Sequence, residues 1–361
     1  MIYLNYAALS PTHPEAEQAV QATLDEFKTY LYSESGLQWY LRKIRECRTR
    51  VAKLLNVNDP SALAFVSNAS TAHYLTIQSL RWQRGDSIVT TTHENPSITR
   101  QLRALEHQGV RIHAIHPSSP DMLVQAFGQA LDRHSAKAIV LSHVSHVDGR
   151  ILPIQTISAL ARKRGVMCIV DGAQAVGHIP VDLSQFEFDV YFFTGHKWCA
   201  GPLGTGAMVV NDRFLNSGST RAVQIFEGNT PQATQFEIGT HNIGLIAGLA
   251  QACERIVHEG LSPAKLQWFR REAKELIGKH AGMRIVEWDG PQAPGILTIQ
   301  GKPDIDHRGL TQQLAEASQV IVKPFVDYPQ DVIPVIRLSW DASLNEQDFR
   351  LGLEKIAEGF S

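Results

Sequence analysis

The chain has few cysteines, no block of like charge and almost no net charge. Its 361 residues include only four cysteines, which are scattered without CxxC spacing: Cys47, Cys168, Cys199 and Cys253. This spacing indicates neither a disulfide framework nor a zinc site, so we expect reduced thiols. The formal net charge of −2 gives no long-range attraction to nucleic acid or to an anionic membrane.

Membrane and export signals are also missing from the sequence. No apolar stretch approaches the roughly 18 residues that a membrane-spanning helix needs. The opening residues, MIYLNYAALSP, lack the basic and apolar regions of a signal peptide. We therefore expect a cytoplasmic protein that binds neither nucleic acid nor membrane. Apolar residues make up 43% of the chain, enough to fill the cores of two domains.

Strand-like and helix-like segments alternate along the first two thirds of the chain. Short apolar runs bounded by Gly or polar residues indicate seven buried strands, and helical stretches separate most of them. The predicted strands cover residues 63–66, 87–91, 111–115, 138–142, 166–170, 190–194 and 207–210. This alternation predicts an α/β fold with a mostly parallel, seven-stranded sheet and helices on both faces.

A second, smaller domain is predicted at the C-terminal end. A helical pattern at residues 244–257 leads into strand-like segments at 284–288, 296–299, 320–322 and 335–339, with helices at 306–317 and 346–357. At the other end, an extended arm precedes a helix in which Val20, Leu24, Phe27 and Leu31 recur at helical spacing. We therefore divide the chain into an arm at 1–14, a large domain at 15–245 and a small α+β domain at 246–361.

Two of the predicted strands lead directly to residues that carry reactive chemistry. Asp171 follows the run at 166–170, and Lys197 comes shortly after the run at 190–194. Parallel strands present their carboxyl ends at one edge of the sheet, where open α/β sheets bind ligands. An amine that forms a Schiff base and an acid that keeps a pyridine nitrogen protonated fit pyridoxal phosphate (PLP). The pair alone is weak evidence, because most lysines are simply solvated.

The longer segment around these two residues is more specific. VDGAQAVGHIPVDLSQFEFDVYFFTGHKWCAGPLGTG, residues 170–206, resembles the fold-type I PLP enzymes of aminotransferase class V, and the resemblance extends over nearly the whole chain. It implies that Lys197 is the catalytic Schiff-base lysine, that Asp171 pairs with the ring nitrogen and that Gln174 donates to the ring hydroxyl. Thr194 and His196 correspond to phosphate contacts.

The resemblance also assigns residues to the phosphate and to a second subunit. The phosphate site includes Ala69, Ser70 and Thr71, which follow the first core strand. A helix start offers amides and a favourable dipole to an anion, although a plain N-cap explains the same residues. Thr240, in residues 236–242, corresponds to a threonine that reaches the phosphate in the partner subunit. This implies a homodimer with shared active sites.

A small-molecule amino-acid substrate is implied by Arg337. This residue corresponds to the arginine that binds the substrate carboxylate, and a guanidinium fork does so bidentately. An ion pair at a strand end is the alternative explanation of Arg337. Asn5 and Ala8 of the arm are further predicted substrate contacts.

Three departures from the family pattern bear on the reaction. Residues 323–329 lie where desulfurases carry a nucleophilic Cys, yet no Cys occurs from residue 254 onward. Asn95 replaces the ring-stacking His, and His146 replaces an Asn that often touches the ring hydroxyl. Although His143 lies close to His146 in sequence, no Cys or carboxylate completes a metal site nearby, so none is predicted. Cys199 is interpreted as a packing residue.

These features predict a C–S lyase. It would act by β-elimination on L-cysteine, cystine or a cysteine conjugate and release pyruvate, ammonia and a sulfur product. One alternative is a class V aminotransferase or epimerase, because the same cofactor apparatus forms the same carbanion. Another is a cysteine desulfurase with a relocated nucleophile. A catalytically silent protein of this fold would have no reason to retain Lys197, Asp171, Gln174 and Arg337 together.

Overall fold

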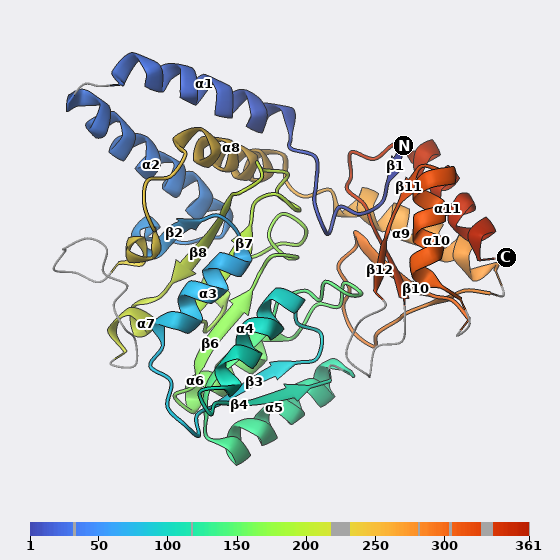
Figure 1. The fold of residues 1–361 in the computed structure, drawn as a ribbon, viewed down its shortest axis with the longest axis horizontal. Helices are drawn as coiled ribbons and strands as arrows, with labels where there is room; N and C mark the ends of the chain where they lie inside the picture. Colours follow the sequence, from blue (N-terminus) through green and yellow to red (C-terminus); the bar gives the residue numbers. More distant parts are fainter. Residues whose placement is uncertain are drawn as a thin grey trace.

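The chain folds into two units that lie side by side (Figure 1). A computed structural model describes residues 1–31, 34–116, 118–217, 232–280, 282–302, 305–325 and 335–360. None of the helices in these ranges combines the length and the apolar character that crossing a membrane requires.

The larger unit is built on a seven-stranded sheet with the order β2-β8-β7-β6-β5-β3-β4. Its strands are β2 (Leu63–Val66), β3 (Ser87–Thr91), β4 (Arg111–Ile115), β5 (Ala136–Ser142), β6 (Met167–Asp171), β7 (Val190–Thr194) and β8 (Gly206–Val210). Only β8 runs against the others, since it pairs antiparallel with both β7 and β2. The predicted mostly parallel sheet of seven strands is therefore confirmed, with strand ends close to those expected.

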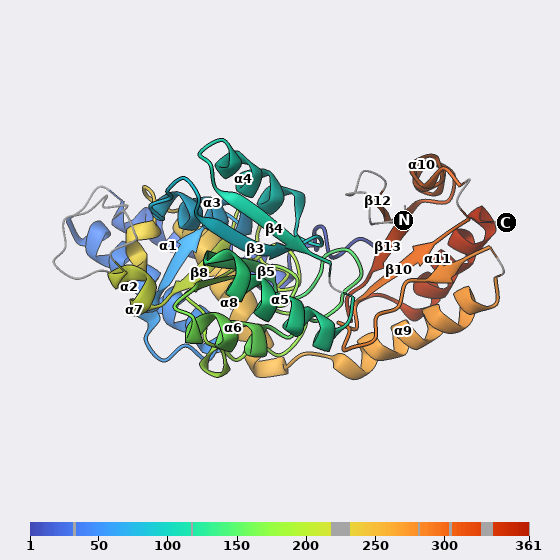
Figure 2. The same ribbon diagram turned by 90° about the horizontal axis from the view of Figure 1, so that it is seen from below.

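Helices cover both faces of this sheet, because its central strands are apolar on both sides. In β6, Met167 and Ile169 pack in one core, whereas Cys168 and Val170 pack in the other, as the alternation of side chains along a strand requires. The first core lies under α3 (Ala69–Ser79) and α4 (Pro96–Glu106). The second lies under α5 (Pro120–His134) and α6 (Ile154–Lys163). Figure 2 shows the two pairs of helices on opposite sides of the sheet.

A layer of three long helices completes the second core. It consists of α1 (Pro14–Tyr30), α2 (Glu34–Leu54) and α8 (Ile243–Glu259), while the short α7 (Asp212–Asn216) lies at the end of β8. Two glycines let α8 approach α1 closely. A Cβ atom at Gly244 would lie 2.6 Å from Leu24 Cγ, and one at Gly248 would lie 2.6 Å from Val20 Cγ2.

The smaller unit is an antiparallel sheet covered by helices, in agreement with the predicted α+β layer. The strand order is β12-β13-β10-β9, formed by β9 (Arg284–Ile285), β10 (Ile296–Gln300), β12 (Lys323–Phe325) and β13 (Val335–Ser339). The helices are α9 (Pro263–Gly278), α10 (His307–Ala317) and α11 (Glu346–Gly359). Neither α9 nor β12 was predicted, and β9 is shorter than the expected strand at 284–288.

The N-terminal arm belongs structurally to the smaller unit. β1 (Ile2–Tyr3) pairs in parallel with β11 (Val320–Ile321), so the predicted strand at 320–322 joins the arm rather than the four-stranded sheet. The core of the large unit continues through α8 as far as Ile256, whereas α9 packs in the core of the small unit. We therefore propose that the division lies at residues 260–262 instead of 245, which falls inside α8.

Candidate active site

A polar pocket lies at the carboxyl edge of the large sheet. Asp171 ends β6, and its register partner Ser142 ends the neighbouring strand β5. The pocket is lined by Ala69, Ser70, Asn95, Ser97, Ser142, Val144, His146, Asp171, Ala173, Gln174 and Lys197. Seven of these are predicted site residues: Ala69, Ser70, Asn95, His146, Asp171, Gln174 and Lys197. Segments far apart in the sequence thus meet at the edge where the strand order predicts a ligand site.

The pocket contains a lysine and a carboxylic acid, and each affects the pKa of the other. Burial lowers the pKa of Lys197 to about 8, while Asp171 raises it and Arg337 lowers it further. Burial raises the pKa of Asp171, against the opposing effects of Lys197 and of the Ala173 amide, which donates to Asp171 Oδ1 at 2.8 Å. An amine with this pKa is partly uncharged near neutral pH, as Schiff-base formation requires. The buried carboxylate suits a cationic ring nitrogen as partner.

A second buried carboxyl group, which sequence reasoning missed, supports the floor of the pocket. Glu94 accepts hydrogen bonds from Thr91 Oγ1 at 2.6 Å, from Ser142 Oγ at 2.6 Å and from the Ser142 amide at 3.1 Å. Burial raises the pKa of Glu94 to about 7, although these hydrogen bonds oppose the shift. The signal in the sequence was an acidic residue shortly after a buried strand, as for Asp171.

Gln174 is held in one orientation by two neighbours. Its Nε2 donates to the Ala7 carbonyl at 2.8 Å, and its Oε1 accepts from Trp198 Nε1 at 2.6 Å. The Trp198 ring stacks on His178, with ring centroids 3.6 Å apart. An amide nitrogen carries two N–H groups, so Gln174 has a second donor for the ring hydroxyl of a cofactor.

Two helices begin at the pocket. Asn68 caps α3 by accepting from the Thr71 amide at 2.9 Å, and Asn95 caps α4 by accepting from the Ser97 amide at 2.9 Å. Ser70 Oγ donates to Ser97 Oγ at 2.9 Å, which ties the two helix starts together. Helix N-termini favour anions, so the two starts and their hydroxyls fit a phosphate. Sequence reasoning missed Ser97, although its Asn-Pro-Ser start is a typical helix beginning.

Asn95 and His93 take different places in the structure. Asn95 lines the pocket while its amide oxygen caps α4, so the side chain belongs both to the pocket wall and to the helix start. His93 is buried beside Ser145 and Asp148, with Nδ1 at 3.4 Å from Ser145 Oγ. It does not line the pocket, and its pKa falls to about 4 chiefly because of burial.

Arg337 lies behind the pocket wall and is fixed on several sides. Its Nη1 donates to the His146 carbonyl at 2.6 Å and its Nη2 donates to Asn5 Oδ1 at 3.0 Å. The guanidinium also lies over the ring of Phe325, 5.2 Å from the centroid. The arm thus reaches the predicted carboxylate site through Asn5, whereas Ala8 is exposed.

The other predicted residues do not line the pocket. Thr194 Oγ1 lies 2.9 Å from His196 Nδ1, and Thr71 Oγ1 lies 2.9 Å from Ser67 Oγ. Thr240 is exposed on the single chain.

The two histidines at 143 and 146 face different surroundings. His143 Nδ1 lies 2.9 Å from Tyr191 OH in the second core, while His146 lines the pocket. Across the described ranges, no group of three or more His, Cys, Asp or Glu side chains has an arrangement that would hold a metal ion.

The fold and the pocket together define a PLP-dependent enzyme of fold type I. A family model, aminotransferase class-V, matches residues 2–323. The chain belongs to this family of PLP-dependent enzymes, and the buried acid, the lysine and the paired helix starts described above fit the cofactor.

Curated relatives are cysteine desulfurases by name. The chain is 32% identical over 216 residues to cysteine desulfurase IscS of Enterobacter sp. (strain 638), a match that covers 58% of this chain and 53% of that protein. It is 29% identical over 269 residues to a probable cysteine desulfurase of Pyrococcus abyssi (strain GE5 / Orsay), covering 71% and 66%. The chain thus spans about half the length of the first of these relatives.

Solved structures share the fold over almost their whole length. The complex of the cystine C–S lyase C-DES with its reaction product cysteine persulfide has a TM-score of 0.88 at 23% identity, covering 99% of this chain and 97% of that one. The apo cysteine desulfurase from Thermococcus onnurineus NA1 has a TM-score of 0.85 at 21% identity, covering 99% and 94%. At this level of identity the likeness establishes the fold.

Proposed function

We propose that the protein is a PLP-dependent C–S lyase that cleaves the Cβ–S bond of L-cysteine, cystine or a larger cysteine conjugate. The products are pyruvate, ammonia and a sulfur compound: sulfide from cysteine and thiocysteine from cystine. The fold is shared with both a cystine C–S lyase and a cysteine desulfurase, so the choice depends on this chain's own residues.

The proposal rests on the burial of the cysteine thiols. All four cysteines are buried, and a desulfurase needs an accessible thiolate to take sulfur from its substrate. Burial raises the pKa of Cys47 to about 11 and raises the pKa of Cys168 even further. Cys199 packs in the second core with Sγ 3.6 Å from the Val176 carbonyl, and it does not line the PLP pocket. None of these thiols is placed to take a sulfur atom from a bound substrate.

The chain's own residues divide the work of elimination. Arg337, held against Asn5 and the His146 carbonyl, orients the substrate carboxylate, which fixes the direction of the Cα–H bond. Lys197, with its pKa near 8, takes the Cα proton and supplies a proton to the sulfur that leaves when the Cβ–S bond breaks. When bound, PLP supplies the electron sink that stabilises negative charge at Cα. Asp171 keeps a cationic ring nitrogen paired.

Product analysis tests this assignment. Incubation with L-cysteine and with cystine should release pyruvate together with sulfide or thiocysteine, without any added keto acid. Cys199→Ser should retain most of this turnover, because the thiol serves in packing. Alanine accompanied by a persulfide on the enzyme would instead establish a desulfurase. Product formation that depends on an added keto acid would establish the aminotransferase alternative.

We further propose that the active protein is a cytoplasmic homodimer. Thr240 is exposed on the single chain and lies three residues before Ile243, the first residue of α8. That position leaves it accessible to the phosphate side of a second copy's pocket.

A further inference from the structure

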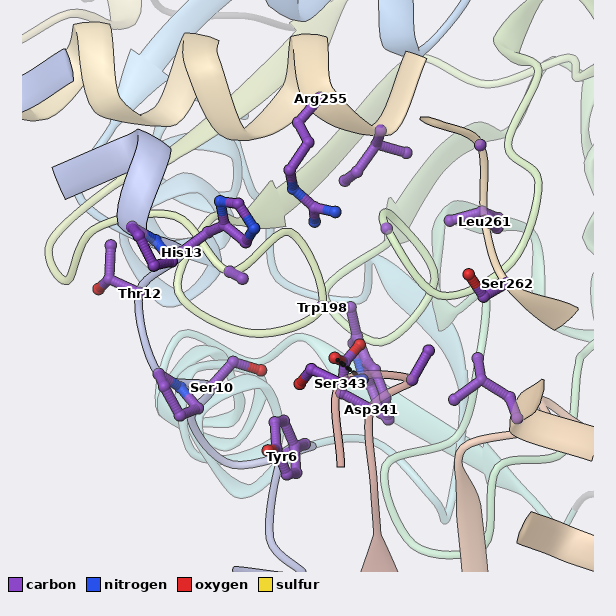
Figure 3. Close-up of a pocket in the computed structure, with 18 residues that line it drawn as sticks. Tyr6, Ser10, Thr12, His13, Trp198, Arg255, Leu261, Ser262, Asp341 and Ser343 are labelled. Atoms are coloured by element: carbon purple, nitrogen blue, oxygen red, sulfur yellow. Dashed lines mark hydrogen bonds between the residues drawn. The ribbon is translucent and has the colours of Figure 1, made fainter. Parts of the chain in front are cut away.

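A second cavity, of about 440 Å³, lies where the arm, the end of α8 and the small unit meet (Figure 3). It is lined mainly by residues 10–14, 255–256, 260–262 and 341–343, together with Tyr6 and Trp198. This volume is in the range of small-molecule sites, roughly 300–1,000 Å³. Arg255 lies near the C-terminal end of α8, whereas Thr240 precedes the N-terminal end of that helix.

Opposite charges face this cavity from different walls. Arg255 points into it from α8, and Asp341 lies across from it beside Ser343 (Figure 3). Arg255 Nη1 pairs with Glu259 at 2.8 Å, but the Glu259 side chain is 56% exposed against 19% for Arg255. An ion pair with an exposed partner contributes little energy, so the guanidinium of Arg255 is able to bind another anion.

Asp341 accepts a hydrogen bond from within its own turn. Its Oδ1 accepts from the Ser343 amide at 2.9 Å. Among the described residues, no basic side chain forms an ion pair with it. The cavity therefore presents a cation and an anion to whatever enters it.

An apolar cavity lies next to this one. The two cavities share four lining residues: Gly177, Ile256, Gly260 and Leu261. The apolar cavity has a volume of about 420 Å³, and its other lining residues are Leu54, Leu55, Val176, Ile179, Pro180, Val181, Val257 and Pro263. A molecule anchored between the two charges thus has an apolar space beside it.

Trp198 connects this cavity to the PLP pocket. Its ring lines the cavity, while its Nε1 donates to Gln174, which lines the pocket. Trp198 also directly follows Lys197 in the chain. A molecule that presses on Trp198 therefore acts on two residues of the PLP pocket.

We propose that this cavity binds a small zwitterionic amino acid with an apolar side chain. Arg255 takes its carboxylate, Asp341 takes its ammonium group and the side chain enters the apolar cavity. Through Trp198 and Gln174, occupancy alters the environment of the cofactor. This site is distinct from the substrate site at Arg337 and does not depend on which reaction the enzyme catalyses.

Calorimetry on the holoenzyme with L-leucine tests the proposal, because this amino acid has no β-leaving group. Arg255→Gln and Asp341→Asn should each weaken L-leucine binding about tenfold, as expected for the loss of a charged hydrogen bond. Two partial ligands separate the contacts. Binding of 4-methylpentanoate, which lacks the amine, should respond only to Arg255→Gln. Binding of 3-methylbutylamine, which lacks the carboxylate, should respond only to Asp341→Asn.

Arg350→Gln is the matched control, since Arg350 is exposed on α11 and pairs with Glu272 outside the cavity. It should leave L-leucine binding unchanged. The absorbance of bound PLP should change with the same saturation constant as the heat signal, and this change should weaken in parallel in Arg255→Gln. Absence of saturable binding, or binding that neither cavity variant weakens, would overturn the site. Binding at the cavity without an absorbance change would overturn the connection through Trp198.

Discussion

An amine must lose its proton before it can form a Schiff base, and the pocket makes this loss easier for Lys197. Burial pulls the pKa of Lys197 down to about 8, and the positive charge of Arg337 acts in the same direction. Asp171 opposes both effects, so the final value reflects a balance within the site. A solvated lysine keeps a pKa near 10.4 and is almost fully charged at neutral pH.

Replacement of this lysine tests its assignment. Lys197→Ala should abolish covalent attachment of PLP and reduce turnover by at least about 10²-fold, because both the anchoring amine and the proton carrier are lost. The protein should stay folded, since the change removes a buried amine. The measurements are the visible absorbance of the cofactor and mass analysis after borohydride reduction. Lys163→Ala, at an exposed site on α6, is the control. A reducible adduct in Lys197→Ala would assign the anchor to another lysine.

The raised pKa of Glu94 predicts how the stability of the protein depends on pH. Its pKa is about 7 in the folded protein, above its ordinary value of 4.5. The folded state therefore holds the proton more tightly than the unfolded state. Stability from this group is present below about pH 4.5 and is lost as the pH rises toward 7, a loss of about 3 kcal/mol. Glu94→Gln should remove this part of the pH dependence.

The measurement compares denaturation midpoints of the wild type and of Glu94→Gln between pH 5 and pH 8. The variant should gain stability relative to the wild type as the pH rises. Parallel curves would show that Glu94 does not titrate in this range.

At the scale of single elements, the turn after β6 determines how the Lys197 segment is seated. Gly177 has φ of +85°, and a Cβ atom there would lie 2.6 Å from the Trp198 carbonyl carbon and 2.7 Å from the Cys199 amide nitrogen. Both atoms belong to the backbone, so they cannot turn away as a side chain would. The turn that begins with Asp171 and the segment that follows Lys197 thus touch directly.

Gly177→Ala measures this contact against a matched control. Gly165 also has a positive φ, of +72°, but a Cβ atom there meets nothing within 4 Å. Gly165→Ala should therefore lose only the conformational cost, about 1 kcal/mol. Gly177→Ala should lose roughly 1–3 kcal/mol more and also weaken PLP binding, because the clash displaces the residues next to Lys197. Equal losses from the two changes, by chemical denaturation, would contradict the close contact.

At the scale of the whole molecule, the described chain assembles much of the PLP pocket from its own large unit. α3 and α4 supply two helix starts that fit a phosphate, β5 and β6 supply the floor, and the arm reaches Arg337 through Asn5. Thr240, by contrast, is exposed and is not among the residues that line the pocket. This arrangement is what a shared dimeric site would require.

Complementation tests the shared site. Lys197→Ala and Thr240→Val chains should each have low activity alone. Mixing them should restore one good site per heterodimer, in which the intact lysine of one chain meets the intact threonine of the other. The readout is turnover after subunit exchange, with Lys197→Ala mixed with itself as the control. Full activity of a monomer at low protein concentration would contradict the shared active site.

Much of the large sheet was predictable from the sequence because its strands are buried on both faces. Short apolar runs such as the one in β7 carry that signal locally, and the Gly and polar residues around them mark the ends. The small unit was harder. β9 and β11 have two residues each, too few for any period to appear, and α9 has polar residues over much of its surface.

The sequence by itself determined the alternation of strands and helices and the family resemblance, and it led to the prediction that Asp171 and Lys197 are the reactive pair. Only the tertiary structure decided that β1 pairs with β11, that Glu94 hydrogen-bonds Ser142 and that α3 and α4 begin side by side at the pocket. The physical reason is the separation along the chain of the residues that interact. Burial and side-chain period are properties of neighbouring residues, whereas these contacts join segments that only the packing of the whole chain brings together.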